Sequence, residues 1–234
     1  MNILAIECSA GPVSAAVISD GKTVGSSFSD IKLTHSQTLF PIMENVLSSV
    51  KLNFTDIDAI AVATGPGSFT GLRIGIASAK GLAEPKNLIC VGASTLLCAA
   101  YMFLGEDAVI CPVIDARCNQ VYNALIRVKG DTVNRLCEDR AILIDDLASE
   151  LQDAGGKIIL CGDATDAVFD AVKGCANIVK APVSLRLPNA VGVGLYAAKA
   201  IENGDYTTAG ELMPIYLKLP QAERELKQKK GENV

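Results

Sequence analysis

The sequence predicts an α/β protein in which one arrangement of strands and helices occurs twice. Half of the residues are hydrophobic, only 5% are aromatic and tryptophan is absent, a mixture that suits helices packed on sheets. Apolar strand patterns alternate with helical patterns along the chain. A shift of 108 positions also aligns the second half with the first, pairing Ile6-Glu7 with Ile114-Asp115 and Val13 with Val121.

The first half begins with three strands. Residues 2–7 form a near-continuous apolar strand, residues 13–18 a second, and residues 23–28 return as a third after a turn at Asp20-Gly21. Next, the spacing of Thr34 and Gln37 predicts a capping box, with Thr34 as N-cap and Gln37 reaching back. The elements expected after it are a helix over 37–50, a strand over 57–63, a helix over 70–84, a strand over 88–91 and a helix over 94–104.

The second half repeats this order. An acid ends its first strand, and its second strand runs into a glycine turn, Lys129-Gly130-Asp131. The elements that follow are helices over 144–153, 165–173 and 189–203, strands over 157–161 and 177–180, and an apolar segment over 211–219. The polar tail, residues 220–234, is expected to be disordered. Three strands, a helix, a strand and a helix, given twice, describe the duplicated ribonuclease-H-like fold of actin-like ATPases and sugar kinases, with two mixed sheets flanked by helices.

The sequence GPGSFTGLRIG, residues 65–75, links the strand over 57–63 to the helix after it. Such a glycine-rich turn can bind phosphate through backbone N–H groups, although it lacks the Gly-Lys-Ser/Thr ending of a P-loop. It can equally be a tight turn with a close-packed helix, in which Ser68 or Thr70 caps the helix. A third interpretation is a docking face, because Gly71, Gly75 and Ala79 lie four residues apart.

Composition excludes some classes of function. The net charge of −5 argues against direct, tight binding to a nucleic-acid backbone, so a partner would have to supply positive charge if RNA is bound. No stretch of about 18 uninterrupted apolar residues predicts a membrane span, and the N-terminus reads as a strand rather than a signal peptide. The eight cysteines form no C-x-x-C pair, which favours reduced, buried thiols in a cytoplasmic protein over a zinc site.

The phrase at residues 65–75, with His35-Ser36-Gln37 upstream and Asp115-Ala116-Arg117 downstream, resembles the bacterial TsaB (YeaZ-like) family. The resemblance covers about residues 2–219. It implies a non-catalytic partner of TsaD in forming threonylcarbamoyladenosine (t6A) on tRNA. It also implies an N-terminal domain of residues 1–105 plus about 189–219, which carries the dimer interface, and a C-terminal domain of residues 106–188.

In that family, pairing with TsaD, or with a second copy when alone, uses the region of the two helices. The interface residues expected on this basis are His35, Leu39, Met43, Leu47, Phe69, Gly71, Leu72, Gly75 and Ala79. If the two helices stand together, they can meet the same pair on another molecule. Gly75→Leu is then expected to abolish pairing and leave the fold intact. The competing interpretation is that both helices simply pack inside one domain.

Glu7 and Asp115 end the equivalent first strands, where actin-like ATPases hold a metal ion and a water near the phosphates. Two such carboxylates could hold magnesium through water. Alternatively they are solvated, or paired with Arg117 or Arg73. Pro12 and the few glycines of the first hairpin weaken the case for phosphate binding. Candidate nucleotide-binding residues are Glu7, Ser9, Gly65, Gly67, Ser68 and Asp115.

His35 is the single histidine, so the chain cannot build the metal site of several histidines that TsaD carries, and no H-E-x-x-H motif is present. No G-x-S-x-G elbow accompanies a Ser-His-Asp triad. His35 is therefore expected either to have a structural role at the start of the helix or to be part of an interface. We expect no catalytic residue, no metal site and no firmly bound cofactor in this chain. ATP or ADP with magnesium is expected only at the interface of a complex.

The resemblance predicts a cytoplasmic, non-catalytic subunit of the complex that transfers a threonylcarbamoyl group from threonylcarbamoyl-AMP to adenosine 37 of tRNA. The expected partners are TsaD, the ATPase TsaE and a second copy of the chain, with tRNA held mainly by TsaD. One alternative is an actin-like small-molecule kinase or ATPase that uses Glu7 and Asp115. The other is a homodimeric scaffold for an unrelated partner.

Overall fold

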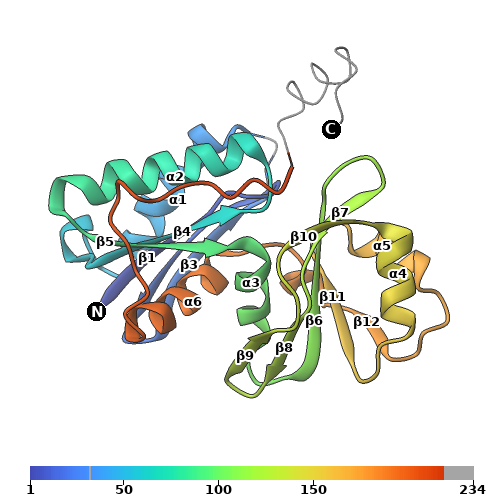
Figure 1. Cartoon of the computed structure of the whole chain (residues 1–234). Coiled ribbons are helices and arrows are strands. Elements are labelled where there is room, and N and C mark those ends of the chain that lie inside the picture. The colour runs from blue at the N-terminus through green and yellow to red at the C-terminus, as the bar shows by residue number, and fades with distance from the viewer. Residues whose placement is uncertain (32, 219–234) are drawn as a thin grey trace, which may run out of the picture.

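The computed structural model of the chain describes residues 1–31 and 33–218. Two sheets with their helices stand side by side, and the last described residues run back over the first half (Figure 1). The expected polar tail, 220–234, and the final residue of the predicted apolar segment lie outside the described residues.

The first sheet has the strand order β3-β2-β1-β4-β5. Its strands β1, β2 and β3 are antiparallel neighbours, whereas β1, β4 and β5 are parallel. The bounds are β1 (Asn2–Glu7), β2 (Val13–Ser19), β3 (Lys22–Ser29), β4 (Ala59–Gly65) and β5 (Ile89–Ser94). The hairpin predicted at Asp20-Gly21 is confirmed, since both residues have positive φ angles, as a two-residue hairpin turn requires.

Helices cover both faces of this sheet (Figure 1). Helices α1 (His35–Ser49) and α2 (Phe69–Ala83) pack on one face, where Leu39, Val46 and Ile76 join the sheet core. Helix α6 (Ala190–Glu202) packs on the other face through small residues such as Ala197. The late helix thus completes the first half. The division into two domains stays a prediction.

The helix caps differ in one respect from the expectation. Ser68 caps α2 as predicted, because its Oγ accepts a hydrogen bond from the N–H of Gly71 at 3.3 Å. Thr34 is the N-cap residue of α1, as predicted, but the predicted capping box is wrong. Thr34 Oγ1 donates to the side chain of Gln37 at 2.8 Å, and Thr34 makes no side-chain cap bond to the backbone.

The second sheet repeats the first around strand β6. Its path is β10-β7-β6-β11-β12, and β8 pairs with another part of β6 and with β9. The bounds are β6 (Asp107–Asp115), β7 (Gln120–Asn123), β8 (Ile126–Lys129), β9 (Thr132–Arg135), β10 (Arg140–Leu143), β11 (Ile158–Cys161) and β12 (Ile178–Lys180). Strands β7 and β8 therefore share the place that β2 fills in the first sheet. Helices α4 (Ile144–Gln152) and α5 (Thr165–Ala171) cover one face. The predicted fold class is confirmed.

A short helix joins the two halves. Helix α3 (Thr95–Ala100) places Cys98 in the core of the first half. Its residues Leu96 and Ala100 belong to the core of the second half, as does Phe103 in the 3₁₀ turn that follows. The two cores meet along this helix, which stands between the sheets in Figure 1.

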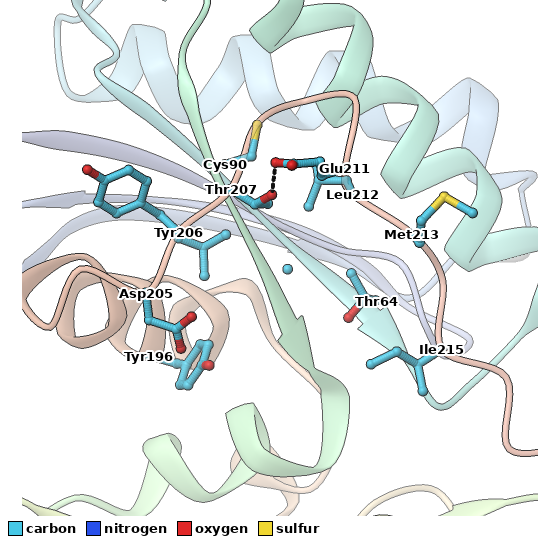
Figure 2. Close-up of a pocket in the computed structure, with 12 residues that line it drawn as sticks. Thr64, Cys90, Tyr196, Asp205, Tyr206, Thr207, Glu211, Leu212, Met213 and Ile215 are labelled. Carbon is cyan, nitrogen blue, oxygen red and sulfur yellow. Dashed lines mark hydrogen bonds between the residues drawn. The ribbon is translucent and has the colours of Figure 1, made fainter.

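Residues 205–218, called the return segment below, run back along β5 and α2 after helix α6. Thr207 forms an isolated antiparallel bridge with Cys90 on the edge strand β5. Farther on, the N–H of Ile215 donates to the carbonyl of Thr64 at 2.8 Å, so these two residues lie together in Figure 2. The side chain of Leu212 is buried in the first core. The apolar segment predicted from residue 211 is part of this return segment, which forms neither a helix nor a strand.

Candidate functional site

A cleft of about 450 Å³ lies between the two halves. The first half lines it with the β1–β2 connection, with His35 at the start of α1, and with the turn that leads into α2. The second half contributes the end of β6 and Asp163, which follows β11. Four of the predicted nucleotide-binding residues line the cleft, namely Ser9, Gly67, Ser68 and Asp115. Glu7 and Gly65 are buried and are not among its lining residues.

The β1–β2 connection is held against α1 and α2 through its carbonyl groups. The N–H of Ser68 donates to the carbonyl of Ser9 at 2.7 Å. His35 Nε2 lies 2.9 Å from the carbonyl oxygen of Ala10. Because a carbonyl oxygen only accepts, Nε2 must carry the proton. The position of His35 agrees with its interpretation as helix-start structure.

Glycine is required where α2 crosses this connection. A Cβ atom at Gly71 would lie 2.0 Å from the carbonyl oxygen of Cys8, and one at Gly67 would lie 2.3 Å from the carbonyl oxygen of Ser9. Both distances are far inside van der Waals contact. The glycines of the motif therefore let the helix and its preceding turn approach the backbone of the β1–β2 connection.

Glu7 is a buried acid rather than a solvated or arginine-paired one, so both expectations for its surroundings are wrong. Its side chain is 1% exposed, and Oε1 accepts the N–H of Ser9 at 2.5 Å. Within the described part of the chain, Oε2 has no hydrogen-bond partner. Burial raises the pKa of Glu7 to about 7. The strand that ends at Glu7 has Ala and Ile neighbours, and these carry no sequence signal of a buried, unpaired oxygen.

Asp115 has the arginine partner expected for it. Its Oδ2 lies 3.1 Å from Nη1 of Arg117, and its Oδ1 accepts the N–H of Arg117 at 2.7 Å. The N–H of Asp115 donates to Oδ1 of Asp163 at 2.8 Å. Burial raises the pKa of Asp163 above its usual value. Sequence reasoning missed Asp163, whose only signal is an acid just after a buried strand.

The turn after Asp115 has an unusual backbone. Arg117, Cys118 and Asn119 have φ angles of 63°, 56° and 57°, so three consecutive residues other than glycine adopt the left-handed conformation. Each such residue costs about 1–3 kcal/mol, and strain of this kind is common at functional sites. All three residues are exposed, and Arg117 lines the cleft.

Most of the predicted interface residues lie in the core of the same chain. Of the predicted set, His35 and Phe69 line the cleft, and the buried members are Leu39, Met43, Leu47, Gly71, Leu72, Gly75 and Ala79. The expectation that Gly71, Gly75 and Ala79 form a free docking face is wrong, because that face packs on the β1–β2 connection and β4. A Cβ at Gly75 would already be in van der Waals contact with Cβ of Cys8 at 3.4 Å and Cγ2 of Val62 at 3.5 Å. The further atoms of a leucine would overpack this site, so Gly75→Leu would disturb the fold as well as any pairing.

The two helices do offer an outer apolar surface. Phe40 on α1 is 47% exposed and lines a groove of about 160 Å³ together with Leu47 on α1 and Leu82 on α2. Ala77 and Gly81 are exposed on α2, and nothing lies within 4 Å of a Cβ built at Gly81. The small residues of α2 that face solvent are thus Ala77 and Gly81, and not the predicted Gly71, Gly75 and Ala79.

Two kinds of feature are absent from the part of the chain that the structure describes. No group of three or more histidine, cysteine, aspartate or glutamate residues in this part of the chain could hold a metal ion. Among the helices of residues 1–31 and 33–218, none is long and apolar enough to cross a membrane.

Fold and cleft together define a protein of the duplicated ribonuclease-H-like class that includes actin-like ATPases and sugar kinases. The chain is 31% identical to the tRNA threonylcarbamoyladenosine biosynthesis protein TsaB of Escherichia coli over 221 residues, 93% of this chain and 95% of that protein. It belongs to the TsaB family.

Three further comparisons bear on this membership. Residues 29–218 match the family model described as TsaD, tRNA N6-adenosine threonylcarbamoyltransferase. The threonylcarbamoyltransferase of Moorella thermoacetica is 27% identical over 175 residues, yet these cover only 50% of that enzyme. YeaZ from Pseudomonas aeruginosa has a TM-score of 0.78 at 22% identity, over 92% of this chain and 99% of YeaZ, and so shares the fold. In length, the chain corresponds to TsaB rather than to the transferase.

Proposed function

We propose that this chain is a non-catalytic subunit of the complex that forms threonylcarbamoyladenosine on tRNA, in which it stabilises TsaD and helps to recruit TsaE. The observation that carries the proposal is the match with E. coli TsaB over 95% of that protein. The match with half of a threonylcarbamoyltransferase supports a shared origin of the two chains. This chain would act by pairing with TsaD, to which it is related, and TsaD would bind most of the tRNA.

The cleft supports a non-catalytic role. Of the two acids at the metal-binding positions of actin-like ATPases, Glu7 is buried and uses one oxygen on the N–H of Ser9. That hydrogen bond occupies the N–H of Ser9 with the carboxyl group of Glu7, so this N–H is not free to donate to a phosphate. Asp115 is already paired with Arg117. ATP or ADP with magnesium, if bound, would then belong to a complex interface rather than to this cleft alone.

TsaD would dock on the outer surface of α1 and α2. The predicted pairing region is retained, but the contacting residues change from the buried stripe to the groove around Phe40 and Leu82. An exposed aromatic ring beside an apolar groove is the kind of anchor on which protein interfaces depend. In the absence of TsaD, the same groove would meet a second copy of the chain.

The test is reconstituted tRNA modification. TsaD, TsaE, ATP, threonylcarbamoyl-AMP and tRNA are combined with and without this chain, and modified adenosine is measured by mass spectrometry. We expect product only in the presence of the chain. Equal product without it would remove the assignment to this pathway.

A matched variant separates the accessory role from the actin-like ATPase alternative. Asp115→Asn removes the charge that an ATPase would need, and Asp131→Asn changes an exposed acid in the β8–β9 turn. We expect the isolated chain to show no magnesium-dependent ATP turnover, and both variants to support product formation. ATP turnover that is lost only in Asp115→Asn would favour the ATPase.

A further inference from the structure

The return segment contacts both walls of the cleft. On the first wall, the ring of Tyr216 stacks on Phe69 with 4.4 Å between ring centroids, and Tyr216 Oη accepts from Nε of Arg73 at 3.0 Å. Phe69 lines the cleft. This end of the segment is therefore fixed to the first residues of α2.

Two residues later the chain reaches the other wall. Nζ of Lys218 donates to the carbonyl of Ala116 at 2.8 Å and to Oε1 of Gln120 at 2.5 Å. Ala116 lines the cleft from the second half, and Gln120 closes the left-handed turn described above. A charged donor with two acceptors makes a stronger contact than a neutral hydrogen bond.

Apolar side chains anchor the same segment in both cores. Ala209 and Leu212 belong to the core of the first half, whereas Leu217 packs on the core of the second half. Because one continuous stretch contributes to two cores, the halves cannot separate at this edge without exposing apolar surface to water.

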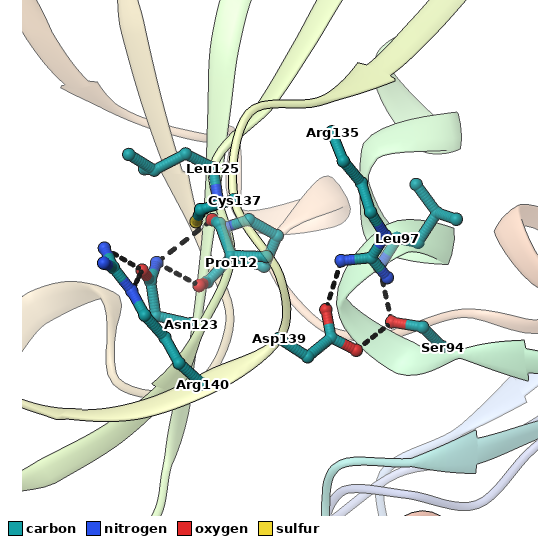
Figure 3. Close-up of polar contacts among 10 residues, drawn as sticks. Ser94, Leu97, Pro112, Asn123, Leu125, Arg135, Cys137, Asp139 and Arg140 are labelled. Atoms are coloured by element: carbon teal, nitrogen blue, oxygen red, sulfur yellow. Dashed lines mark hydrogen bonds and ion pairs between the residues drawn. The ribbon is translucent and has the colours of Figure 1, made fainter.

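A separate polar contact joins the halves where β5 runs into α3. Oγ of Ser94 donates to Asp139 at 2.6 Å, and Asp139 pairs with Arg135 at 2.5 Å (Figure 3). Asp139 is 12% exposed in its side chain. Ser94 also caps α3, the helix along which the two cores meet. This contact and α3 fix the halves at a point distinct from the return segment.

We propose that the return segment is a latch that sets how far the cleft opens, with α3 and the Ser94–Asp139 contact as its hinge. Two halves of one chain move relative to each other unless a large apolar interface holds them, so a tie across the open edge restricts the range of that motion. The latch residues are Tyr216 on one wall and Lys218 on the other. This proposal goes beyond the assignment to a tRNA-modifying complex and does not depend on it.

The first test measures the distance between the halves by pulsed electron spin resonance. Spin labels are attached at Ser48→Cys on α1 and Lys173→Cys after α5, both exposed. The full-length chain carries serine in place of the cysteines that are not buried, Cys118, Cys137 and Cys175. We expect one narrow distance in this chain and a broader distribution after Lys218→Met. Lys199→Met, which removes an equally long cation from an exposed ion pair on α6, is the control and should leave the distribution unchanged.

Amide hydrogen exchange gives an independent readout. Loss of the Lys218 contact should speed exchange at Ala116 and Gln120 about tenfold, because their turn loses a charged hydrogen-bond donor. The double variant Tyr216→Ala/Lys218→Met removes both anchors and should show the larger effect, with its fold checked by circular dichroism. A broad distance distribution in the parent chain would overturn the latch. So would a Lys218→Met variant with unchanged distances and exchange, whether or not the double variant folds.

Discussion

Oε1 of Glu7 accepts a hydrogen bond from the backbone N–H of Ser9 at 2.5 Å. The acid that ends β1 therefore binds the backbone of the β1–β2 connection that follows it. The same carboxyl group is almost fully buried, and its second oxygen has no hydrogen-bond partner among the described residues. An acid in this setting is stable mainly in its neutral form. Its protonation therefore affects folding as well as the chemistry of the cleft.

Folding stability should depend on pH through Glu7. Burial raises its pKa from 4.5 to about 7, so the folded chain binds this proton more tightly than the unfolded chain. The stabilisation is complete below pH 4.5, falls as the pH rises towards 7, and is absent above that. The two pKa values correspond to about 3 kcal/mol. Urea unfolding from pH 4.5 to 8 should show this loss relative to Glu7→Gln, which cannot ionise.

The control for this measurement is Glu44→Gln, because Glu44 is an exposed acid on α1. Its unfolding free energy should follow that of the parent chain at every pH. Parallel curves for the parent and Glu7→Gln would show that Glu7 keeps one protonation state over this range.

Two glycines of α2 should respond in opposite directions to alanine. Gly71→Ala places a Cβ 2.0 Å from the carbonyl of Cys8, so the backbone must move, at a cost of about 3 kcal/mol in unfolding free energy. Gly81→Ala places its Cβ in open space and should stabilise the helix by about 0.5–1 kcal/mol. Urea unfolding of both variants measures the difference. Equal effects would mean that α2 does not need glycine where it crosses the β1–β2 connection.

The stacked rings of Phe69 and Tyr216 should be energetically coupled. A double-mutant cycle with Phe69→Leu and Tyr216→Leu is expected to give a coupling energy of about 1 kcal/mol in thermal or urea unfolding. Tyr206, at the other end of the return segment, serves as the matched control, and its cycle with Phe69 should give a coupling near zero. Equal coupling in the two cycles would argue against a specific contact at Tyr216.

Phe40 should matter for pairing and not for folding. Phe40→Asp removes an exposed ring from the groove between α1 and α2, and the affinity for TsaD should fall about tenfold or more. Phe28→Asp changes a similarly exposed ring on β3 and should leave the affinity unchanged. Isothermal titration calorimetry measures both, alongside unfolding of each variant. A Phe40→Asp chain that binds as tightly as the parent would place the docking surface elsewhere.

Cys118 should be the most reactive thiol. It is exposed in the left-handed turn, whereas burial raises the pKa of Cys111 to about 12 and that of Cys98 well above its usual value. A colorimetric thiol reagent should therefore show one fast phase in the native chain, which Cys118→Ser removes. In denaturant all eight thiols should react. A fast phase that persists in Cys118→Ser would mean that a second cysteine is accessible.

Much of the fold could be predicted because its signals are local. The hairpin at Asp20-Gly21 needs only two turn residues between alternating strands. The duplication follows from the acids at Glu7 and Asp115 and the strands beside them, which end β1 and β6 in the structure. Residue type and position made Ser68 and Thr70 the two candidate caps of α2, and Ser68 is the cap in the structure. Each of these inferences uses residues that are neighbours in sequence.

The interpretation of α2 shows what periodicity leaves undetermined. Spacing shows that Gly71, Gly75 and Ala79 share a face, but it does not say which partner that face meets. A flat face can approach another molecule or a loop of its own chain, and here it meets Cys8, more than sixty positions earlier. The exposed stripe of Ala77 and Gly81 has nearly the same composition.

The surroundings of the cleft acids and the return segment depend on contacts that are remote in sequence. Asp163 meets Asp115 across the ends of two strands of the second sheet, and Lys218 meets Ala116 about a hundred positions away. The return segment has neither a helical nor an alternating apolar pattern. Its apolar residues therefore predict that it is partly buried, but not which part of the structure it packs against. The contact of Asp163 with Asp115 forms only when the second sheet has assembled, and that of Lys218 with Ala116 only when the return segment reaches the second half.

Helix α6 and most of the return segment complete the first half of the structure, although they follow the second half in sequence. The ribosome therefore delivers residues 106–188, with the whole second sheet, before the pieces that cover one face of the first sheet and protect its β5 edge. During synthesis, the second half can fold while the first half still exposes apolar side chains such as Ile3 and Val91. The nascent chain is thus most exposed to aggregation in its earliest part, and a chaperone that binds it there would have to hold it until residues 190–218 have been synthesised.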